Sequence, residues 1–185
     1  AAIEQGRAIY ANVRKVIRYL LACNLGELLV MGLGIALGLP LPLLPGHILF
    51  INLVTDGLPA VALGLEPPEP DAMRQPPRKP HEGVFSRGLG RRIAAWGMLM
   101  GLTTLALYAW SWAGTGDPVR ARTLALASLV VAQLLHAVDC RSEHRTGFLR
   151  GAPPRPLLFA LALSAAALLL CVHWPPLQRL FRTAP

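Results

Sequence analysis

The chain has 185 residues, of which 54% are hydrophobic and only 15% are charged, and its net charge is +8. A soluble domain usually has about a quarter of its residues charged. Here the hydrophobic residues are concentrated in runs long enough to cross roughly 30 Å of hydrocarbon. The basic residues lie between these runs and not along one stripe with interleaved aromatic residues, which argues against nucleic-acid binding. The composition therefore predicts a membrane protein.

The hydrophobic runs predict an all-α fold, a polytopic transmembrane bundle with about five spans. The spans are expected at about 16–38, 47–65, 89–113, 123–138 and 156–174. The uncharged segment 39–46 suits a tight turn, whereas 66–92 is dense in proline and charge and predicts an ordered surface loop. No signal peptide is recognisable, and the chain starts without Met, so we expect it to be the interior of a longer polypeptide.

The basic residues predict the orientation of the bundle. Fourteen of the eighteen Lys and Arg residues fall in the N-terminal segment and in the loops after the second and fourth spans. Cytoplasmic segments carry an excess of such residues. The N-terminal end is therefore expected in the cytoplasm, and five spans then place the C-terminal end outside.

Two acidic residues lie inside strongly hydrophobic stretches. A carboxylate at mid-bilayer depth costs about 2.5–3.5 kcal/mol on insertion scales, so it persists where it has a partner or a task. Glu27 has Asn24 at helical spacing, and Asp56 has Asn52 and Thr55. Carboxylate, amide and hydroxyl oxygens suit a hard cation such as Ca²⁺. The predicted metal ligands are Asn24, Glu27, Asn52, Thr55, Asp56 and, less firmly, Gln133 in the fourth span.

Pro59 follows Asp56 closely and removes a backbone donor opposite the Thr55 carbonyl. The second span is therefore expected to be kinked or unwound beside its carboxylate. Broken helices at mid-membrane commonly line ion sites, because freed carbonyls become ligands.

Other interpretations of these residues remain open. Asn24, Thr55 or Gln133 alone could serve interhelical hydrogen bonding, and Glu27 and Asp56 could relay protons. His136, Cys140 and His144 recur every four residues, but this spacing alone is a weak indication of a zinc site.

No phosphate-binding GxxxxGK[ST] loop and no hydrolase arrangement occurs, so the chain by itself is not expected to hydrolyse ATP. The stretches GRAIYANVRKVIRYLLACNLGE and ILFINLVTDGLPAVALGLEPPEPDAMRQPPRKP closely resemble the C-terminal membrane region of type II P-type ATPases, in their calcium-pump branch. The resemblance extends, more weakly, from Glu4 to about Phe181.

This resemblance implies that the five spans correspond to the family's fifth to ninth transmembrane helices. Residues 1–15 would be the end of the phosphorylation domain and the stalk, and 16–185 the C-terminal cation-transporting membrane domain. Asn24 and Glu27 would be fifth-helix ligands, and Asn52, Thr55 and Asp56 sixth-helix ligands. Gln133 departs from the glutamate of two-site calcium pumps, so one ion per cycle, or a different ion, is expected.

The resemblance also implies the partners. Ca²⁺ would be the transported ion, and ATP and Mg²⁺ would act only through pump domains outside this chain. The expected surroundings are a lipid bilayer, most simply a bacterial plasma membrane, and the other domains and helices of the pump. Two alternatives of another class are a self-contained small cation-binding membrane protein and a regulatory remnant without ATPase activity.

Overall fold

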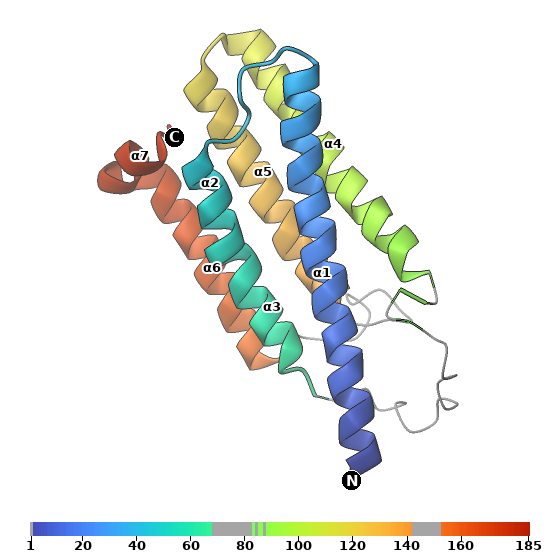
Figure 1. The fold of residues 1–185 in the computed structure, drawn as a ribbon. Helices are drawn as coiled ribbons and strands as arrows, with labels where there is room; N and C mark the ends of the chain where they lie inside the picture. The colour runs from blue at the N-terminus through green and yellow to red at the C-terminus, as the bar shows by residue number, and fades with distance from the viewer. Residues whose placement is uncertain (1, 68–82, 84, 87, 142–152) are drawn as a thin grey trace.

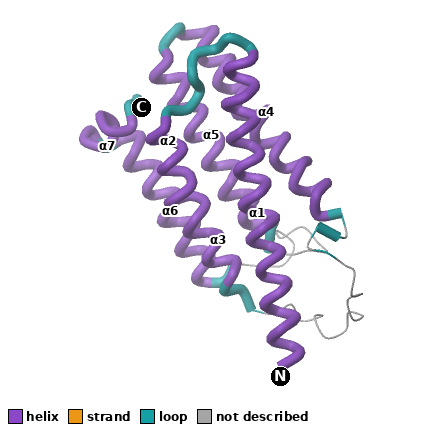
Figure 2. Tube along the Cα trace, viewed as in Figure 1, coloured by secondary structure: helices purple, strands orange, loops and turns teal. Residues whose placement is uncertain are grey.

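The computed structural model describes residues 2–67, 83, 85–86, 88–141 and 153–185. The elements lie side by side in one bundle (Figure 1), and the described residues form helices and loops without a strand (Figure 2). In chain order the elements are α1 (Ala2–Ala36), α2 (Pro45–Phe50), the π-helical segment η1 (Ile51–Asp56), α3 (Gly57–Gly64), α4 (Leu89–Thr115), α5 (Pro118–Asp139), α6 (Arg155–His173) and α7 (Pro175–Phe181).

Five helical stretches of the described chain are long and apolar enough to cross a membrane. They are Ile3–Ala36, Pro45–Gly64, Leu89–Thr115, Pro118–Asp139 and Arg155–His173. Large hydrophobic side chains on their outer faces, among them Leu28, Leu53 and Phe159, are more than half exposed, as lipid contact requires. The predicted all-α bundle with five spans is confirmed.

Two helices begin earlier than predicted. α1 starts at Ala2, because the polar first fifteen residues continue without a break into the first span. α5 starts at Pro118 and not near Thr123. Asp117 caps this helix, since its carboxylate accepts a hydrogen bond of 2.8 Å from the Val119 amide, and proline is favoured at the first helical position.

α1 packs along α4, and α4 packs along α5 (Figure 1). The close approach of α1 and α4 depends on glycine. A Cβ atom added at Gly97 would lie 2.7 Å from the Leu25 side chain, and one added at Gly101 would lie 2.8 Å from Leu29. Small residues at such crossings let membrane helices approach closely.

The second span is attached to its neighbours at the end of the bundle opposite the N-terminus, where α7 also lies (Figure 1). Nε2 of the buried His47, near the start of α2, is 2.6 Å from the Phe181 carbonyl oxygen. The rings of Phe50 and Phe181 meet edge to face, with centroids 5.5 Å apart. The segment after α6 thus folds back onto α2.

The predicted loops at the other end lie largely outside the described residues, which omit 68–82 and 142–152. Arg91 and Arg92, where the predicted loop 66–92 and the predicted span 89–113 overlap, belong to α4. Asp139 directly follows the predicted span 123–138 and is the last residue of α5.

Candidate cation site

The second span stays helical beside Asp56, where a kinked or unwound stretch was predicted, but its helical geometry changes there. Its helix changes from α to π geometry over Ile51–Asp56 and returns to α geometry at Gly57. Pro59 has no amide hydrogen, so it cannot donate to Thr55 in α register or to Val54 in π register. Side chains from two other helices supply these donors. The Tyr19 hydroxyl donates to the Thr55 carbonyl at 2.9 Å, and the Ser164 hydroxyl donates to the Val54 carbonyl at 3.0 Å.

Glu27 on α1 lies inside the bundle with 6% of its surface exposed. Each carboxylate oxygen accepts one amide hydrogen bond. Oε1 accepts from Nε2 of Gln133 at 3.1 Å, and Oε2 accepts from Nδ2 of Asn52 at 3.3 Å. The Glu27 carboxylate therefore receives neutral donors from the fourth span and from η1.

Asp56, at the end of η1, is 1% exposed. Its Oδ1 accepts a hydrogen bond of 3.3 Å from the Tyr19 hydroxyl, whereas the buried Oδ2 has no hydrogen-bond partner among the described residues. Glu27 and Asp56 are near enough to interact electrostatically. Within the described chain neither forms an ion pair with a basic side chain. An uncompensated buried charge is costly, so a positive partner would stabilise this pair.

Gln133 connects the first and second spans. It is fully buried, and besides donating to Glu27 its Oε1 accepts from the Thr55 hydroxyl at 3.4 Å. The same hydroxyl also donates to the Ile51 carbonyl at 2.9 Å. Gln133 is therefore a member of the polar network and not a residue that merely fills space.

The structure brings five of the six predicted ligands together and leaves one aside. Glu27, Asn52, Thr55 and Gln133 are joined by hydrogen bonds, and Tyr19 links Asp56 to the backbone of Thr55. Asn24 differs. Its residue is exposed and its amide donates to the Leu20 carbonyl of its own helix at 2.8 Å.

Sequence reasoning missed Tyr19 and Ser164. Tyr19 lies inside the predicted first span, and a buried tyrosine hydroxyl usually has a hydrogen-bond partner. Ser164 is the one hydroxyl residue in the otherwise apolar interior of α6, and an isolated polar group there needs a partner. Which carbonyl each hydroxyl would reach depends on the π-helical geometry, which the sequence does not reveal.

The side chains of this network are of the kind that hard cations prefer. Two carboxylates would balance one divalent ion, and the amide and hydroxyl groups can add neutral oxygens. The side chains of the network offer oxygen atoms and not imidazole nitrogen or thiolate sulfur, and oxygen suits Ca²⁺ better than Zn²⁺.

The alternative zinc site has two of its three residues in the described chain, since His144 lies outside it. His136 is fully buried and packs against the rings of Tyr19 and Trp96, with centroids 6.0 and 4.6 Å away. Its Nε2 is 3.3 Å from Sγ of Cys140. Among the described residues no three His, Cys, Asp or Glu side chains are grouped to hold a metal.

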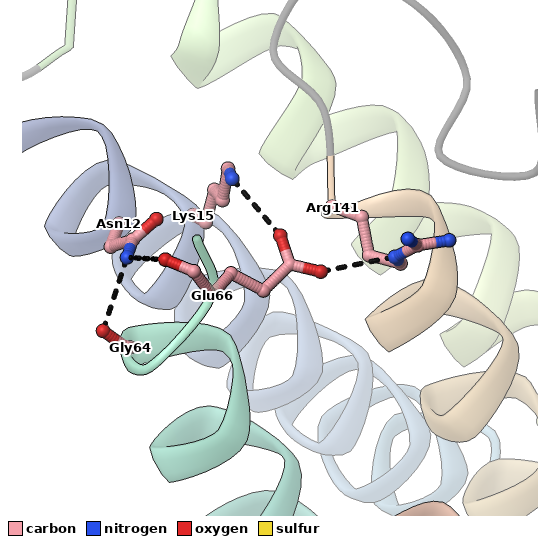
Figure 3. A network of polar contacts seen from close by, with 5 residues as sticks. All are labelled: Asn12, Lys15, Gly64, Glu66 and Arg141. Carbon is pink, nitrogen blue, oxygen red and sulfur yellow. Dashed lines mark hydrogen bonds and ion pairs between the residues drawn. The ribbon is translucent and has the colours of Figure 1, made fainter. Parts of the chain in front are cut away.

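A second polar cluster closes the end of the bundle where α3 and α5 stop (Figure 3). The Glu66 carboxylate lies between Lys15 Nζ and Arg141 Nε, each 3.0 Å away, and these three residues are at most 4% exposed. The Asn12 amide donates to the carbonyls of Gly64 and Glu66 at 3.1 and 2.7 Å. These contacts join α1 to the ends of the second and fourth spans.

Arg18 and Asp139 form another buried ion pair between α1 and the end of α5. Lys15, Arg18 and Arg141 are among the basic residues from which the cytoplasmic side was predicted. The structure buries them in ion pairs between helices, which the sequence did not indicate.

Comparison with known proteins shows the family of the chain. Residues 40–185 match the family described as "Cation transporting ATPase, C-terminus". The chain is 48% identical over 185 residues to a calcium-transporting ATPase of Bacillus subtilis (strain 168), covering 99% of this chain and 21% of that protein. It is 36% identical over 197 residues to calcium-transporting ATPase 1 of Bacillus cereus (strain ATCC 10987 / NRS 248), covering 97% of this chain and 22% of that protein.

The chain thus spans about a fifth of the length of these relatives. The family match covers most of the chain, and the described residues include five helices long and apolar enough to cross a membrane. The chain therefore belongs to the P-type cation-transporting ATPases and corresponds to their C-terminal membrane region.

Proposed function

We propose that this chain is the cation-binding membrane part of an ATP-driven calcium pump. The observation that carries the proposal is the pair of buried carboxylates, Glu27 and Asp56, which no basic side chain of the described residues neutralises. Groups of this kind inside a membrane bundle mark ion pathways. The names of the two relatives support calcium as the ion.

Binding of an ion would break hydrogen bonds within this network and replace them with contacts to the ion. Asn52 and Gln133 now present amide hydrogens to Glu27. Rotation of each amide would turn its oxygen toward an ion held by Glu27 and Asp56. The Thr55 hydroxyl, which now donates to Gln133, can accept from the rotated amide, because a hydroxyl has both capacities. Asn24 would have to leave the Leu20 carbonyl to join.

Within this chain Glu27 and Asp56 supply two negative charges, which balance one divalent ion. Gln133 adds no charge where two-site calcium pumps have a glutamate, so one ion per cycle, or a different ion, is the expectation that a measurement of bound Ca²⁺ tests. A proton-relay role for the carboxylates, without bound metal, is the alternative that an ion-binding measurement excludes.

The remaining parts of the proposal concern the surroundings. Residues 1–15 would form the end of the phosphorylation domain and the stalk, and residues 16–185 the membrane domain. The N-terminal end would face the cytoplasm, and the membrane would be a bacterial plasma membrane. ATP and Mg²⁺ would be bound by other domains of the pump, and this chain would supply the ion site.

The test uses the complete native polypeptide in membrane vesicles. We expect phosphorylation by ATP to require Ca²⁺, and the variants Glu27→Gln and Asp56→Asn to lose this dependence or the phosphorylation itself. Asp117→Asn is the matched control, because Asp117 is an exposed carboxylate at a helix start and asparagine also caps helices. Normal calcium affinity in both site variants would refute the assignment.

A further inference from the structure

We propose that Ser164 is a positioning residue for the cation site, although it does not touch either carboxylate. Its hydroxyl holds the Val54 carbonyl and so fixes the π-helical geometry that presents Thr55 and Asp56 to the bundle interior. This inference rests on the proposed function insofar as its effect is read through ion binding.

The π-helical segment needs external donors. A π turn pairs each carbonyl with the amide five residues later, and an α turn pairs it with the amide four residues later. Pro59 lies five residues after Val54 and four residues after Thr55. It has no amide hydrogen, so it cannot donate to Val54 in a π turn or to Thr55 in an α turn. A buried carbonyl without a donor is costly. Side-chain hydroxyls can supply the hydrogens that Pro59 cannot.

The two donors come from opposite neighbours of η1. Tyr19 on α1 donates to Thr55 at 2.9 Å, and Ser164 on α6 donates to Val54 at 3.0 Å. Ser164 is fully buried. A helical serine ordinarily bonds the carbonyl three or four residues earlier in its own helix, as Ser128 does with Ala125 at 3.0 Å. The interhelical bond of Ser164 is therefore a specific contact.

The Ser164 contact can affect the cation site because Val54, Thr55 and Asp56 are consecutive residues. Val54 faces α6 through its carbonyl, Thr55 reaches Gln133 on α5, and Asp56 reaches Tyr19 on α1. Without the Ser164 hydroxyl, the Val54 carbonyl loses its donor and the segment can leave the π geometry. The cation would then have to restore that geometry on binding, which lowers its apparent affinity.

The experiment measures the calcium dependence of phosphorylation in the complete polypeptide carrying Ser164→Ala. We expect the half-saturating calcium concentration to rise about three- to tenfold, the range for one lost hydrogen bond, with the maximal phosphoenzyme level unchanged. Ser164→Thr retains a hydroxyl and should restore near-normal affinity. Ser128→Ala is the matched control and should change nothing, since Ser128 bonds only its own helix.

A second set of variants, made in the Pro59→Ala protein, distinguishes a positioning role of Ser164 from a general packing role. Pro59→Ala returns an amide hydrogen near the same carbonyls, so Ser164→Ala should lose most of its effect there. An equal effect in both backgrounds would overturn the proposal, as would normal calcium affinity of Ser164→Ala. If Ser164→Ala does not accumulate in membranes, Ser164→Cys can replace it, because a thiol is a weaker donor of similar size. Ser164→Cys should give a smaller decrease in calcium affinity, and a normal affinity would overturn the proposal.

A readout independent of calcium distinguishes failure of this inference from failure of the proposed function. Hydrogen exchange of the backbone amides in residues 50–60 should be faster in Ser164→Ala than in Ser128→Ala in detergent. If wild-type phosphorylation does not depend on calcium but this difference appears, the proposed function fails and the positioning contact stands. Equal exchange in the two variants refutes the contact.

Discussion

Removing the charge of Glu66 should destabilise the bundle strongly. Its carboxylate lies 3.0 Å from both Lys15 Nζ and Arg141 Nε, and the three side chains are 1–5% exposed. Breaking a buried ion pair by removing one partner costs about 3–5 kcal/mol, because the remaining charge is left uncompensated. Glu66→Gln keeps the shape and one acceptor oxygen, so we expect the lower end, about 3 kcal/mol.

Thermal unfolding in detergent measures this loss. For a domain of this size about 3 kcal/mol corresponds to a decrease in melting temperature of about 6–12 °C. A thiol-reactive dye reports the transition, because Cys23, Cys140 and Cys171 are at most 1% exposed in the folded chain. Arg120→Gln is the control. It removes the exposed pair with Asp117, whose atoms are 3.7 Å apart, and should cost less than about 1 kcal/mol.

A double-mutant cycle tests the stated cause. Lys15→Met removes one of the two cations that contact Glu66, so the double variant should be more stable than the sum of the single effects by about 1 kcal/mol or more. If Glu66→Gln lowers the melting temperature no more than Arg120→Gln does, the buried ion pairs do not stabilise the bundle as the geometry indicates.

Three further substitutions give distinct outcomes. Gln133→Glu replaces the amide donor of Glu27 by a like charge and should change the number of Ca²⁺ bound per phosphoenzyme or the affinity in an isotope-binding assay; unchanged values mean that Gln133 is not a ligand. Pro59→Ala should raise thermal stability, since a helix-interior proline costs about 3 kcal/mol, but lower calcium affinity because the π segment can become α-helical; a gain in both would contradict this. Gly101→Val would press on Leu29 and should destabilise the folded chain by about 1–3 kcal/mol in the thiol-dye assay, whereas Gly32→Val, with open space around it, should not.

The positions of the spans follow from sequence because hydrocarbon thickness sets both length and composition. The first fifteen residues were not assigned to a helix, because a polar helical extension leaves no hydrophobic signal. The start of α5 was readable in principle, from Asp117 as cap and Pro118 as first residue.

The site was predictable as a set of residues but not as a geometry. Spacing put Asn24 and Glu27 on one face, yet three residues along a helix leave about 60° between side chains. That difference suffices to expose Asn24 while Glu27 is buried. Pro59 predicted a kinked or unwound segment, but the sequence did not show that the hydroxyls of Tyr19 and Ser164, on helices distant in sequence, donate to its carbonyls.

The buried ion pairs were not predicted for a related reason. Lys15, Glu66 and Arg141 are each ordinary residues near a span end, and only the meeting of three helix segments makes them partners. The sequence contains the charges, whereas their pairing belongs to the tertiary structure.

The second span resembles a rod fixed at both ends. At one end His47 and Phe50 are attached to Phe181, and at the other Glu66 is attached to Lys15 and Arg141. Between these attachments lies a π-helical segment, the one part of the rod whose pitch is irregular. A rotation or displacement of either end would then change the helical pitch of this segment, where Asp56 lies. Movement of the helix ends and the affinity for an ion would therefore depend on the same few peptide units.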